Sequence, residues 1–293
     1  MTTPTTTPWP RSRTLDRRAL LLGAGTALVA VACSRGGSGD TSSAPGSSAS
    51  GAATPMTTAA ASATPDATGA AGLAALTAAD FDGLGTCALL PEKTAGPFPL
   101  DEQLDRSDIT ESYPGHPVRL GLRVVDAACA PVAGAAVEVW HADATGDYSA
   151  FADGGDGKDE GPGTTFLRGT QTAGDDGIVE FLTVYPGWYR GRAVHVHLRV
   201  HLDDATVLTS QLFFDEGYTA GVYAEEPYAA NGLPDTSNAR DGIAGDPEAE
   251  GTLVVTTAGE TSAGAGTLAL VNLGVDPEAT SSAGSVGGPP GRT

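Results

Sequence analysis

Eight short stretches between residues 117 and 275 have the hydrophobic pattern of β-strands. Each is rich in Val, Leu, Thr and aromatic residues and is bounded by Gly, Pro or Asp, as strands and their turns are. The stretches are 117–126, 135–143, 164–172, 178–185, 193–202, 206–214, 252–257 and 266–275. Long amphipathic helical patterns are absent, and only residues 70–84 have the composition of a short helix. This spacing predicts an all-β fold, an antiparallel β-sandwich with long irregular loops.

Two connections between the predicted strands stand out. Asp175-Asp176-Gly177 is a tight-turn signal between 164–172 and 178–185. Residues 215–250 are rich in Gly, Pro, Asp and Glu and predict a long irregular insertion. Loops of this length within a compact domain often carry function.

The stretch AVHVHLRVHL at 193–202 alternates strictly between apolar and polar residues. Because successive side chains of a strand point to opposite faces, His195 and His197 share one face with Arg199 and His201. One interpretation is an amphipathic strand whose polar face lies in solvent. Two imidazoles on one face can also chelate a metal ion. A zinc or copper site would call for a third His or Cys close to this pair, and the lack of one weakens that interpretation.

The start of the chain has the composition of a targeting sequence. Residues 11–33 contain a basic stretch, a short apolar run and a small-residue end, which is the pattern of an export signal. The run is too short to span a bilayer comfortably, and Arg17-Arg18 directly before it indicates the twin-arginine route. The sequence AVAC ending at Cys33 fits an ordinary cleavage site and also a lipoprotein box in which Cys33 is acylated.

Composition divides the chain into four parts. We expect a signal peptide over 1–33, a disordered linker rich in Ala, Ser, Thr, Gly and Pro over 34–79, a β-sandwich domain over 80–277 and a disordered tail over 278–293. The third part is long enough for one domain with a sizeable core. The protein is therefore expected outside the cytoplasm, either as a cell-surface lipoprotein or as a secreted protein.

The formal net charge of −20 at pH 7 limits the partners. Binding of nucleic acid needs a cationic surface, and so does adhesion to anionic lipid. We therefore expect no nucleic-acid partner, and membrane contact only through a lipid on Cys33.

Two cysteines remain if Cys33 is lipidated. In an oxidising compartment Cys87 and Cys129 would form a disulfide that closes a loop of about 40 residues and stabilises the fold by about 4 kcal/mol. The alternative is two independent free thiols.

Five short motifs occur in a fixed order along the predicted domain. They are W-x-A-x-x-x-G-x-Y at 140–148, F-L-R-G-x-Q-x-x-x-x-D-G at 166–177, P-G-x-Y at 186–189, R-x-x-H-x-H at 192–197 and T-S-Q-L-F-F at 209–214. Together they resemble the intradiol ring-cleavage dioxygenases, the family of catechol and protocatechuate dioxygenases. The stretch CALLPEKTAGPFPLD at 87–101 is similar to the start of that family's domain, and the resemblance covers about residues 85–276.

The resemblance implies a mononuclear, non-haem Fe(III) ion bound by Tyr148, Tyr189, His195 and His197. Fe(III) is a hard, highly charged cation, and phenolate oxygen is a hard anionic ligand whose proton the metal drives off. Two tyrosinates and one hydroxide balance the charge of the ion, so the buried site is neutral.

The resemblance also implies the reaction. The substrates are a catechol-type aromatic and O2, and the ring opens between its two hydroxyl-bearing carbons to a muconate-type diacid. Tyr189 is the ligand that the substrate displaces, Arg192 stabilises negative charge on the substrate, and Gln211 lies near the same site. The residues expected at the substrate pocket are Pro97, Phe98 and Trp188.

One departure from the family pattern leaves the substrate unassigned. His195 follows Tyr189 by only six positions, a shorter interval than in the well-known catechol and protocatechuate enzymes, so the loop that helps to select the substrate is trimmed. The alternative function is a non-catalytic β-sandwich binding module on a surface tether, for carbohydrate or protein. Such a module would more often show exposed aromatic side chains in a row.

Overall fold

The computed structural model describes residues 73–283 except 86, 101–103, 152–162 and 204. The predicted signal sequence, Cys33 and most of the predicted linker lie outside the described residues, and so does most of the predicted tail. Within the described part of the chain, no helix is long and apolar enough to cross a bilayer.

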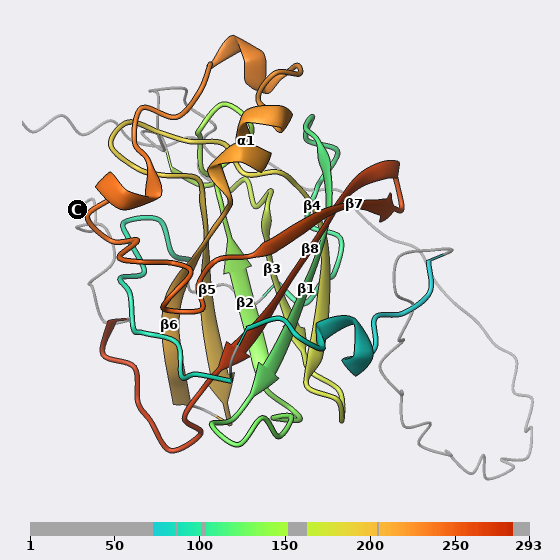
Figure 1. Ribbon diagram of the computed structural model, residues 1–293, viewed down its shortest axis with the longest axis vertical. Coiled ribbons are helices and arrows are strands. Elements are labelled where there is room, and N and C mark those ends of the chain that lie inside the picture. Colours follow the sequence, from blue (N-terminus) through green and yellow to red (C-terminus); the bar gives the residue numbers. More distant parts are fainter. Residues whose placement is uncertain (1–72, 86, 101–103, 152–162, 204, 284–293) are drawn as a thin grey trace, which may run out of the picture. The chain divides into compact units, whose positions relative to one another are not determined.

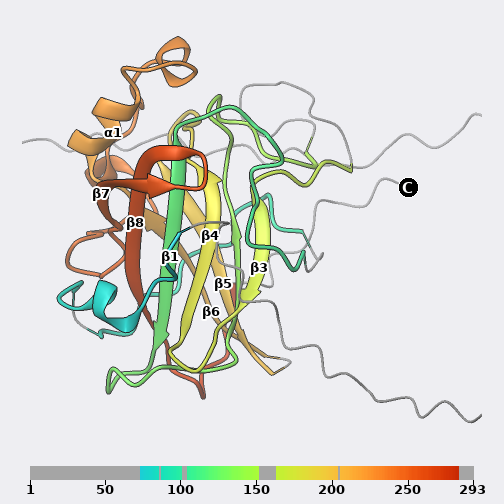
Figure 2. The ribbon, with the colours of Figure 1, turned by 90° about the vertical axis from the view of Figure 1, so that its right-hand side faces the viewer.

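Two four-stranded sheets enclose the main hydrophobic core (Figures 1 and 2). The first sheet has the order β4-β1-β8-β7, from strands β1 (Pro117–Val125), β4 (Ile178–Val184), β7 (Val255–Thr261) and β8 (Gly264–Gly274). The second has the order β3-β2-β5-β6, from strands β2 (Ala136–Trp140), β3 (Arg168–Thr172), β5 (His195–Leu202) and β6 (Ala205–Phe213). The predicted all-β sandwich is confirmed.

One pair of strands departs from the antiparallel arrangement. β1 and β8 run parallel, with Val118 opposite Thr267, whereas the other strand pairs of the two sheets are antiparallel. β7 and β8 form a hairpin, and Gly264 at its turn has a φ of +102°, which glycine adopts readily. The hairpin leaves β7 at the edge of the sheet and places β8 beside β1.

The polar face of β5 is covered, which excludes the interpretation of a solvated face. The strand is buried on both faces from His195 to Val200. Val196, Leu198 and Val200 point into the core between the sheets, and His195 and His197 are 2% and 0% exposed on the other face. Buried polar side chains need hydrogen-bond partners, so other segments of the chain must provide partners for this face of β5.

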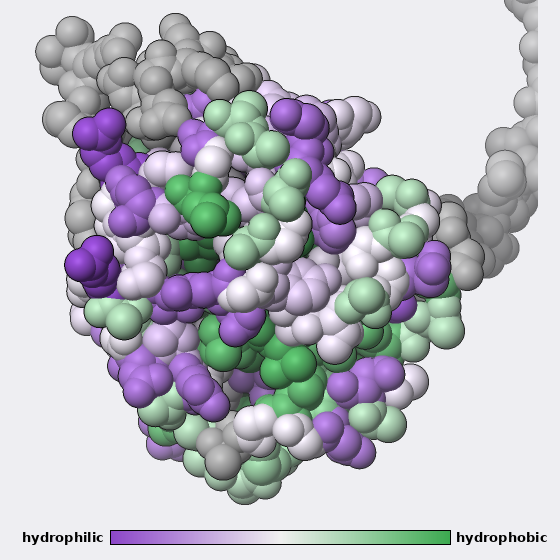
Figure 3. Space-filling model, turned by 45° about the horizontal axis from the view of Figure 1, so that its top comes forward, coloured by the Kyte–Doolittle hydropathy of each residue, from purple (hydrophilic) through white to green (hydrophobic). Residues whose placement is uncertain are grey.

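The insertion 215–250 contains a helix that the sequence pattern did not predict. α1 (Glu216–Val222) begins after Asp215, whose side chain accepts a hydrogen bond from the backbone N–H of Tyr218. Seven residues with two glycines are too few to show an apolar period, so the prediction of an irregular segment is wrong here. Two 3₁₀ turns follow, η2 (Tyr228–Ala230) and η3 (Asn238–Arg240). The insertion lies at the upper end of the sandwich in Figures 1 and 2. Figure 3, turned toward that end, shows strongly hydrophobic residues set between hydrophilic ones.

The folded part extends beyond the predicted boundaries of 80 and 277. Leu76 is buried against Phe81 and Leu270, and η1 (Ala78–Phe81) is the short helix expected within 70–84. At the other end, the backbone N–H of Ser281 donates to the carbonyl of Thr206. Leu76 and Ser281 are thus part of the fold, although the sequence around each resembles the linker or the tail in composition.

Cys87 and Cys129 are joined by a disulfide, with their Cα atoms 5.3 Å apart and a sequence separation of 42. We expect the double variant Cys87→Ser/Cys129→Ser to unfold with a free energy lower by about 4 kcal/mol, because the unfolded chain regains the entropy of the open loop. Denaturant unfolding without reductant measures this difference. A reductant should destabilise the wild-type protein by a similar amount and leave the double variant unchanged. Equal stability of the wild-type protein and the double variant without reductant would contradict the prediction.

Candidate metal centre

Four side chains from three segments converge at one end of β5. His195 and His197 lie on β5 itself, where His197 is opposite Trp140 of β2 and Gln211 of β6. Tyr148 follows β2 after a short loop, and Tyr189 follows β4 through the Pro186-Gly187 turn. The sheet therefore fixes the positions of the two imidazoles, and two loops place the phenols next to them.

The donor atoms of the other three side chains surround the Nε2 atom of His195. Tyr148 Oη is 3.2 Å from it, Tyr189 Oη is 3.4 Å from it, and His197 Nε2 is 3.1 Å from it. The structure thus brings together all four residues that the sequence indicated as metal ligands.

These spacings fit a single bound cation. Nitrogen and oxygen ligands at about 2.0–2.1 Å from a metal ion, with angles between 90° and 110°, are themselves about 2.9–3.4 Å apart. The measured separations from His195 Nε2 fall in that interval. Two phenol oxygens with two imidazole nitrogens suit a hard, highly charged ion such as Fe(III) better than a soft one.

The tautomer of His195 suits a ligand. Its Nδ1 lies 2.7 Å from the carbonyl oxygen of Ala193, so Nδ1 carries the proton and donates it. Nε2 is then left with a lone pair that faces the other three donors. Backbone orientation of a metal-binding imidazole through its far nitrogen is the usual arrangement in metalloproteins.

His197 is held by packing. Its ring stacks on Trp140 with centroids 5.0 Å apart and an interplanar angle of 3°. Gly96 covers the imidazole: a Cβ atom at this position would lie 3.0 Å from Cε1 of His197. Nδ1 of His197 is buried without a hydrogen-bond partner among the described residues, so these ring contacts hold it in place.

Burial keeps all four groups neutral while no cation is bound. Burial, and secondly the nearby Arg192, lowers the pKa of His195 to about 3. Burial, together with His195 and Arg192, also lowers the pKa of His197 well below its usual value. Burial raises the pKa of Tyr148 and of Tyr189 above that of an ordinary tyrosine. Both imidazole lone pairs are therefore available, and both phenols keep their protons until a cation displaces them.

An aromatic wall stands beside Tyr148. Phe98 stacks on the Tyr148 ring with centroids 4.5 Å apart, and it meets Tyr189 and Phe151 edge-on. Pro97 is exposed next to Phe98. Trp188 lies elsewhere: it packs against the main core, and its indole N–H donates to the carbonyl of Gly232. Of the predicted pocket residues, Phe98 is the one in direct contact with the tyrosines.

Phe98 belongs to segment 87–98, which runs along β6 to the centre. The backbone N–H of Lys93 donates to the carbonyl of Thr209, and the Thr94 carbonyl accepts from the side chain of Gln211. With Gly96 over His197, this segment supplies much of the cover for the polar face of β5.

The two loops that carry the tyrosines touch through glycines. A Cβ at Gly187 would lie 1.9 Å from the carbonyl oxygen of Asp143, and one at Gly146 would lie 2.3 Å from that of Trp188. Gly146 also has a φ of +94°. Only residues without a side chain allow this approach, which sets the positions of Tyr148 and Tyr189 relative to each other.

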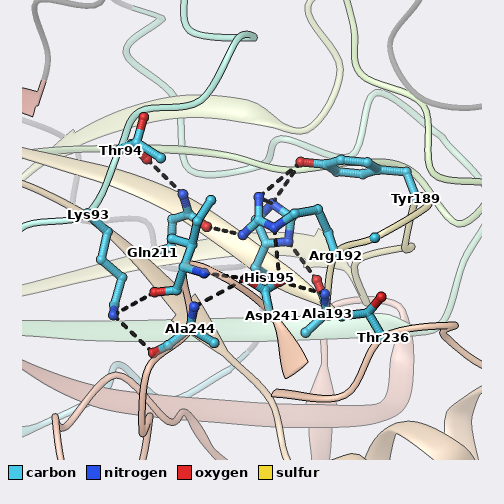
Figure 4. Close-up of polar contacts among 12 residues, drawn as sticks. Lys93, Thr94, Tyr189, Arg192, Ala193, His195, Gln211, Thr236, Asp241 and Ala244 are labelled. Carbon is cyan, nitrogen blue, oxygen red and sulfur yellow. Dashed lines mark hydrogen bonds and ion pairs between the residues drawn. The ribbon is translucent and has the colours of Figure 1, made fainter. Parts of the chain in front are cut away.

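Arg192 reaches the centre from the start of β5 (Figure 4). Its Nη1 donates to Tyr189 Oη at 3.1 Å and lies 3.4 Å from His195 Nε2. Its Nη2 donates to Gln211 Oε1 at 2.5 Å. Arg192 therefore contacts two of the four candidate ligands directly. Gln211 is linked to them through its hydrogen bond with Arg192.

Sequence reasoning missed one residue of this group. Asp241, from the insertion, forms an ion pair with Arg192, with Nε and Oδ2 2.9 Å apart. No local pattern marks it, because it lies in a loop 49 residues farther along the chain. His141, by contrast, stays outside the centre: its Nε2 contacts Thr183 Oγ1, and burial lowers its pKa to about 4.

Among the described residues, no group of three or more His, Cys, Asp and Glu side chains is placed to bind a metal ion. This disfavours a zinc or copper site built from such ligands. The candidate centre consists instead of two phenols and two imidazoles.

Known proteins share both the sequence and the fold of this chain. A family model described as Dioxygenase matches residues 92–226. Chlorocatechol 1,2-dioxygenase of Rhodococcus opacus is 28% identical over an alignment of 121 residues, and the match covers 35% of this chain and 45% of the relative. Catechol 1,2-dioxygenase 1 of Acinetobacter lwoffii is 37% identical over an alignment of 99 residues, and the match covers 28% of this chain and 30% of the relative. The chain thus spans less than half the length of the curated relatives that it matches.

A solved structure matches over a greater length. The intradiol ring-cleavage dioxygenase from Tetranychus urticae is 31% identical, with a TM-score of 0.60, and the match covers 67% of this chain and 98% of that one. The match extends over nearly the whole of the relative. This chain therefore belongs to the intradiol ring-cleavage dioxygenase family.

Proposed function

We propose that this protein is an extracytoplasmic intradiol dioxygenase that uses a mononuclear, non-haem Fe(III) ion. It adds both atoms of O2 to a catechol-type aromatic and opens the ring between the two hydroxyl-bearing carbons, giving a muconate-type diacid. The observation that carries the proposal is the convergence of Tyr148, Tyr189 and His197 on the Nε2 atom of His195. Family membership supports the same reaction.

Bound Fe(III) would supply a Lewis acid that draws electron density from a coordinated catecholate. The four side chains would hold the ion, and the two phenols, once ionised, would contribute two of the negative charges that balance it. His195 and His197 would bind as neutral imidazoles and add no charge, and in the metal-free protein burial already lowers their pKa values.

The two tyrosines have different surroundings, which supports different roles. Tyr148 is 0% exposed and stacked beneath Phe98, whereas Tyr189 is only partly buried and its oxygen accepts a hydrogen bond from Arg192. Tyr189 is therefore the ligand that can leave and take up a proton from an arriving catechol. Tyr148 remains in place.

Arg192 places a permanent positive charge at the edge of the centre. Its Nη1 is directed at Tyr189 Oη and His195 Nε2, and a substrate that binds beside these atoms would bring its negative charge close to the guanidinium. A fixed donor of this kind stabilises negative charge in a dry site more strongly than water does. Phe98, which is partly exposed and stacks on Tyr148, offers an apolar aromatic surface beside the centre, as an aromatic ring needs.

The location outside the cytoplasm rests on the predicted export signal, and the Cys87–Cys129 disulfide supports it because such bonds persist in oxidising compartments. The alternative of a binding module lacks support. The exposed large hydrophobic side chains among the described residues are Leu89, Leu233 and Val255, none of which is aromatic.

The test is oxygen uptake by the iron-loaded protein with a panel of catechols. Tyrosinate bound to Fe(III) absorbs visible light by charge transfer, so the pure protein should be red to burgundy. The product should be the diacid from cleavage between the hydroxyls. A colourless protein that contains stoichiometric iron, or cleavage beside the hydroxyls, would overturn the proposal.

A further inference from the structure

The carboxylate of Asp241 is fully buried, with its side chain 0% exposed. Oδ2 accepts hydrogen bonds from Arg192 Nε at 2.9 Å and from the backbone N–H of Ala193 at 2.7 Å. Oδ1 accepts from the backbone N–H groups of Ile243 at 2.8 Å and Ala244 at 3.2 Å. Four donors thus satisfy both oxygens, which makes this a stable place for a negative charge.

Three partners fix the guanidinium of Arg192 on three sides (Figure 4). Asp241 holds Nε, Gln211 holds Nη2 and Tyr189 lies at Nη1. Gln211 is itself fixed by the Thr94 carbonyl, 2.7 Å from its Nε2. A guanidinium is planar, so fixing Nε and Nη2 also determines where Nη1 points.

The charge of Asp241 has a second consequence. Arg192 is mostly buried, with 13% of its side chain exposed, and lies beside a centre that would hold a cation. An unpaired buried guanidinium would be costly there and would be repelled outward. The adjacent carboxylate makes the pair neutral overall, so the guanidinium can stay with Nη1 facing the donor atoms. Although burial opposes ionisation, the N–H groups of Ala193 and Ile243 and the charge of Arg192 keep the pKa of Asp241 below its usual value.

We propose that Asp241 is the positioning residue for Arg192: this carboxylate from the insertion fixes the guanidinium in the orientation that serves the ring-cleavage site. The proposal rests on the function proposed above. It gives the insertion 215–250 a defined part in that function, through one side chain that touches neither the metal ligands nor the substrate.

The test compares Asp241→Asn with Glu250→Gln. Both variants remove one carboxylate charge from the insertion, but Glu250 pairs with Lys93 at 2.7 Å and is apart from Arg192. In the asparagine variant one oxygen can still accept from Ile243 and Ala244, whereas an amide NH2 would meet the donors of Arg192 and Ala193. The substitution therefore preserves the local turn and removes the hold on the guanidinium.

The first readout is exchange of the Arg192 Nε–H in the metal-free full-length protein, followed by nitrogen-resolved NMR. The signal is assigned from its loss in Arg192→Lys. We expect a protected Nε–H in the wild type and in Glu250→Gln, and exchange at least about 10-fold faster in Asp241→Asn, since one charge-assisted bond of this kind contributes about that factor or more. Unchanged protection in Asp241→Asn would overturn the proposal.

The second readout is steady-state kinetics of the iron-loaded protein. We expect kcat of Asp241→Asn to fall about 10-fold or more with KM nearly unchanged, because a misdirected donor weakens stabilisation of developing charge. Glu250→Gln should keep the wild-type kcat. An equal fall of kcat in both variants would mean that loosening of the insertion is responsible, and would overturn the proposal.

The two proposals can fail separately. A wild-type protein without iron colour and ring cleavage would overturn the proposed function, while Nε–H exchange in the metal-free protein still decides whether Asp241 orients Arg192. If Asp241→Asn does not fold, Asp241→Glu replaces it, because this change keeps the charge and shifts the carboxylate by one methylene. Slow exchange and full kcat in Asp241→Glu would then overturn the proposal.

Discussion

Replacing His197 with alanine is expected to abolish iron binding. The substitution removes one of four converging donors from a fully buried position, and the lost ligand has no neighbour among the described residues that could take its place. Loss of partners that merely orient metal ligands already lowers metal affinity about 10–100-fold, so loss of a ligand should lower it by at least about 100-fold. Metal analysis and the visible absorption of the purified protein measure the effect.

His201→Ala is the matched control. His201 lies on the same face of the same strand, but it is partly exposed and its Nδ1 contacts Thr206 Oγ1 at 3.0 Å. This variant should keep its iron, its colour and its activity. If His197→Ala also kept full colour and ring-cleaving activity, the ligand assignment would be wrong.

Replacing Gly187 with alanine should disturb both the fold and the centre. The new methyl group would lie 1.9 Å from the carbonyl oxygen of Asp143, and this contact is with backbone that cannot rotate away. Overpacking of this kind costs about 1–3 kcal/mol or more. The loops that carry Tyr148 and Tyr189 must then separate, so we expect a lower unfolding midpoint together with weaker visible absorption per bound iron.

Gly221→Ala provides the comparison. Gly221 lies in α1, and a Cβ there would meet nothing within 4 Å. Because alanine favours helix over glycine by about 0.5–1 kcal/mol, this variant should be as stable as the wild type or slightly more so. A Gly187→Ala protein with wild-type stability and colour would show that the two loops do not depend on their close contact.

The sandwich could be predicted from the sequence because alternation of apolar and polar residues directly reflects the two faces of a strand. The convergence of the four candidate ligands could be predicted because the motifs around Tyr148, Tyr189 and the His195–His197 pair follow one another in a recognisable order. The relative direction of paired strands could not be predicted in this way. The alternation in β8 is the same whether the strand runs parallel or antiparallel to β1, so the sequence pattern does not reveal the parallel pair.

The surroundings of the centre could not be predicted in the same way. Much of the cover over the histidine face comes from segment 87–98, and Arg192 is held by Asp241; both are distant in sequence from the 193–202 strand and have no periodic pattern. The 193–202 strand alone therefore suggested a solvated polar face. α1 could not be predicted from periodicity either, because it is short and begins at a single capping residue, Asp215, rather than showing an apolar stripe.

The position of the disulfide determines how a mechanical load would enter the molecule. Cys87 comes directly before the residues that reach Gly96 and Phe98, and it is covalently linked to Cys129, just past the end of β1. Once tension on the chain ahead of Cys87 had separated Leu76 and Phe81 from Leu270, it would pass through the sulfur atoms into the loop after β1. The hydrogen bonds and ring contacts that segment 87–98 makes around the imidazoles would carry little of that force.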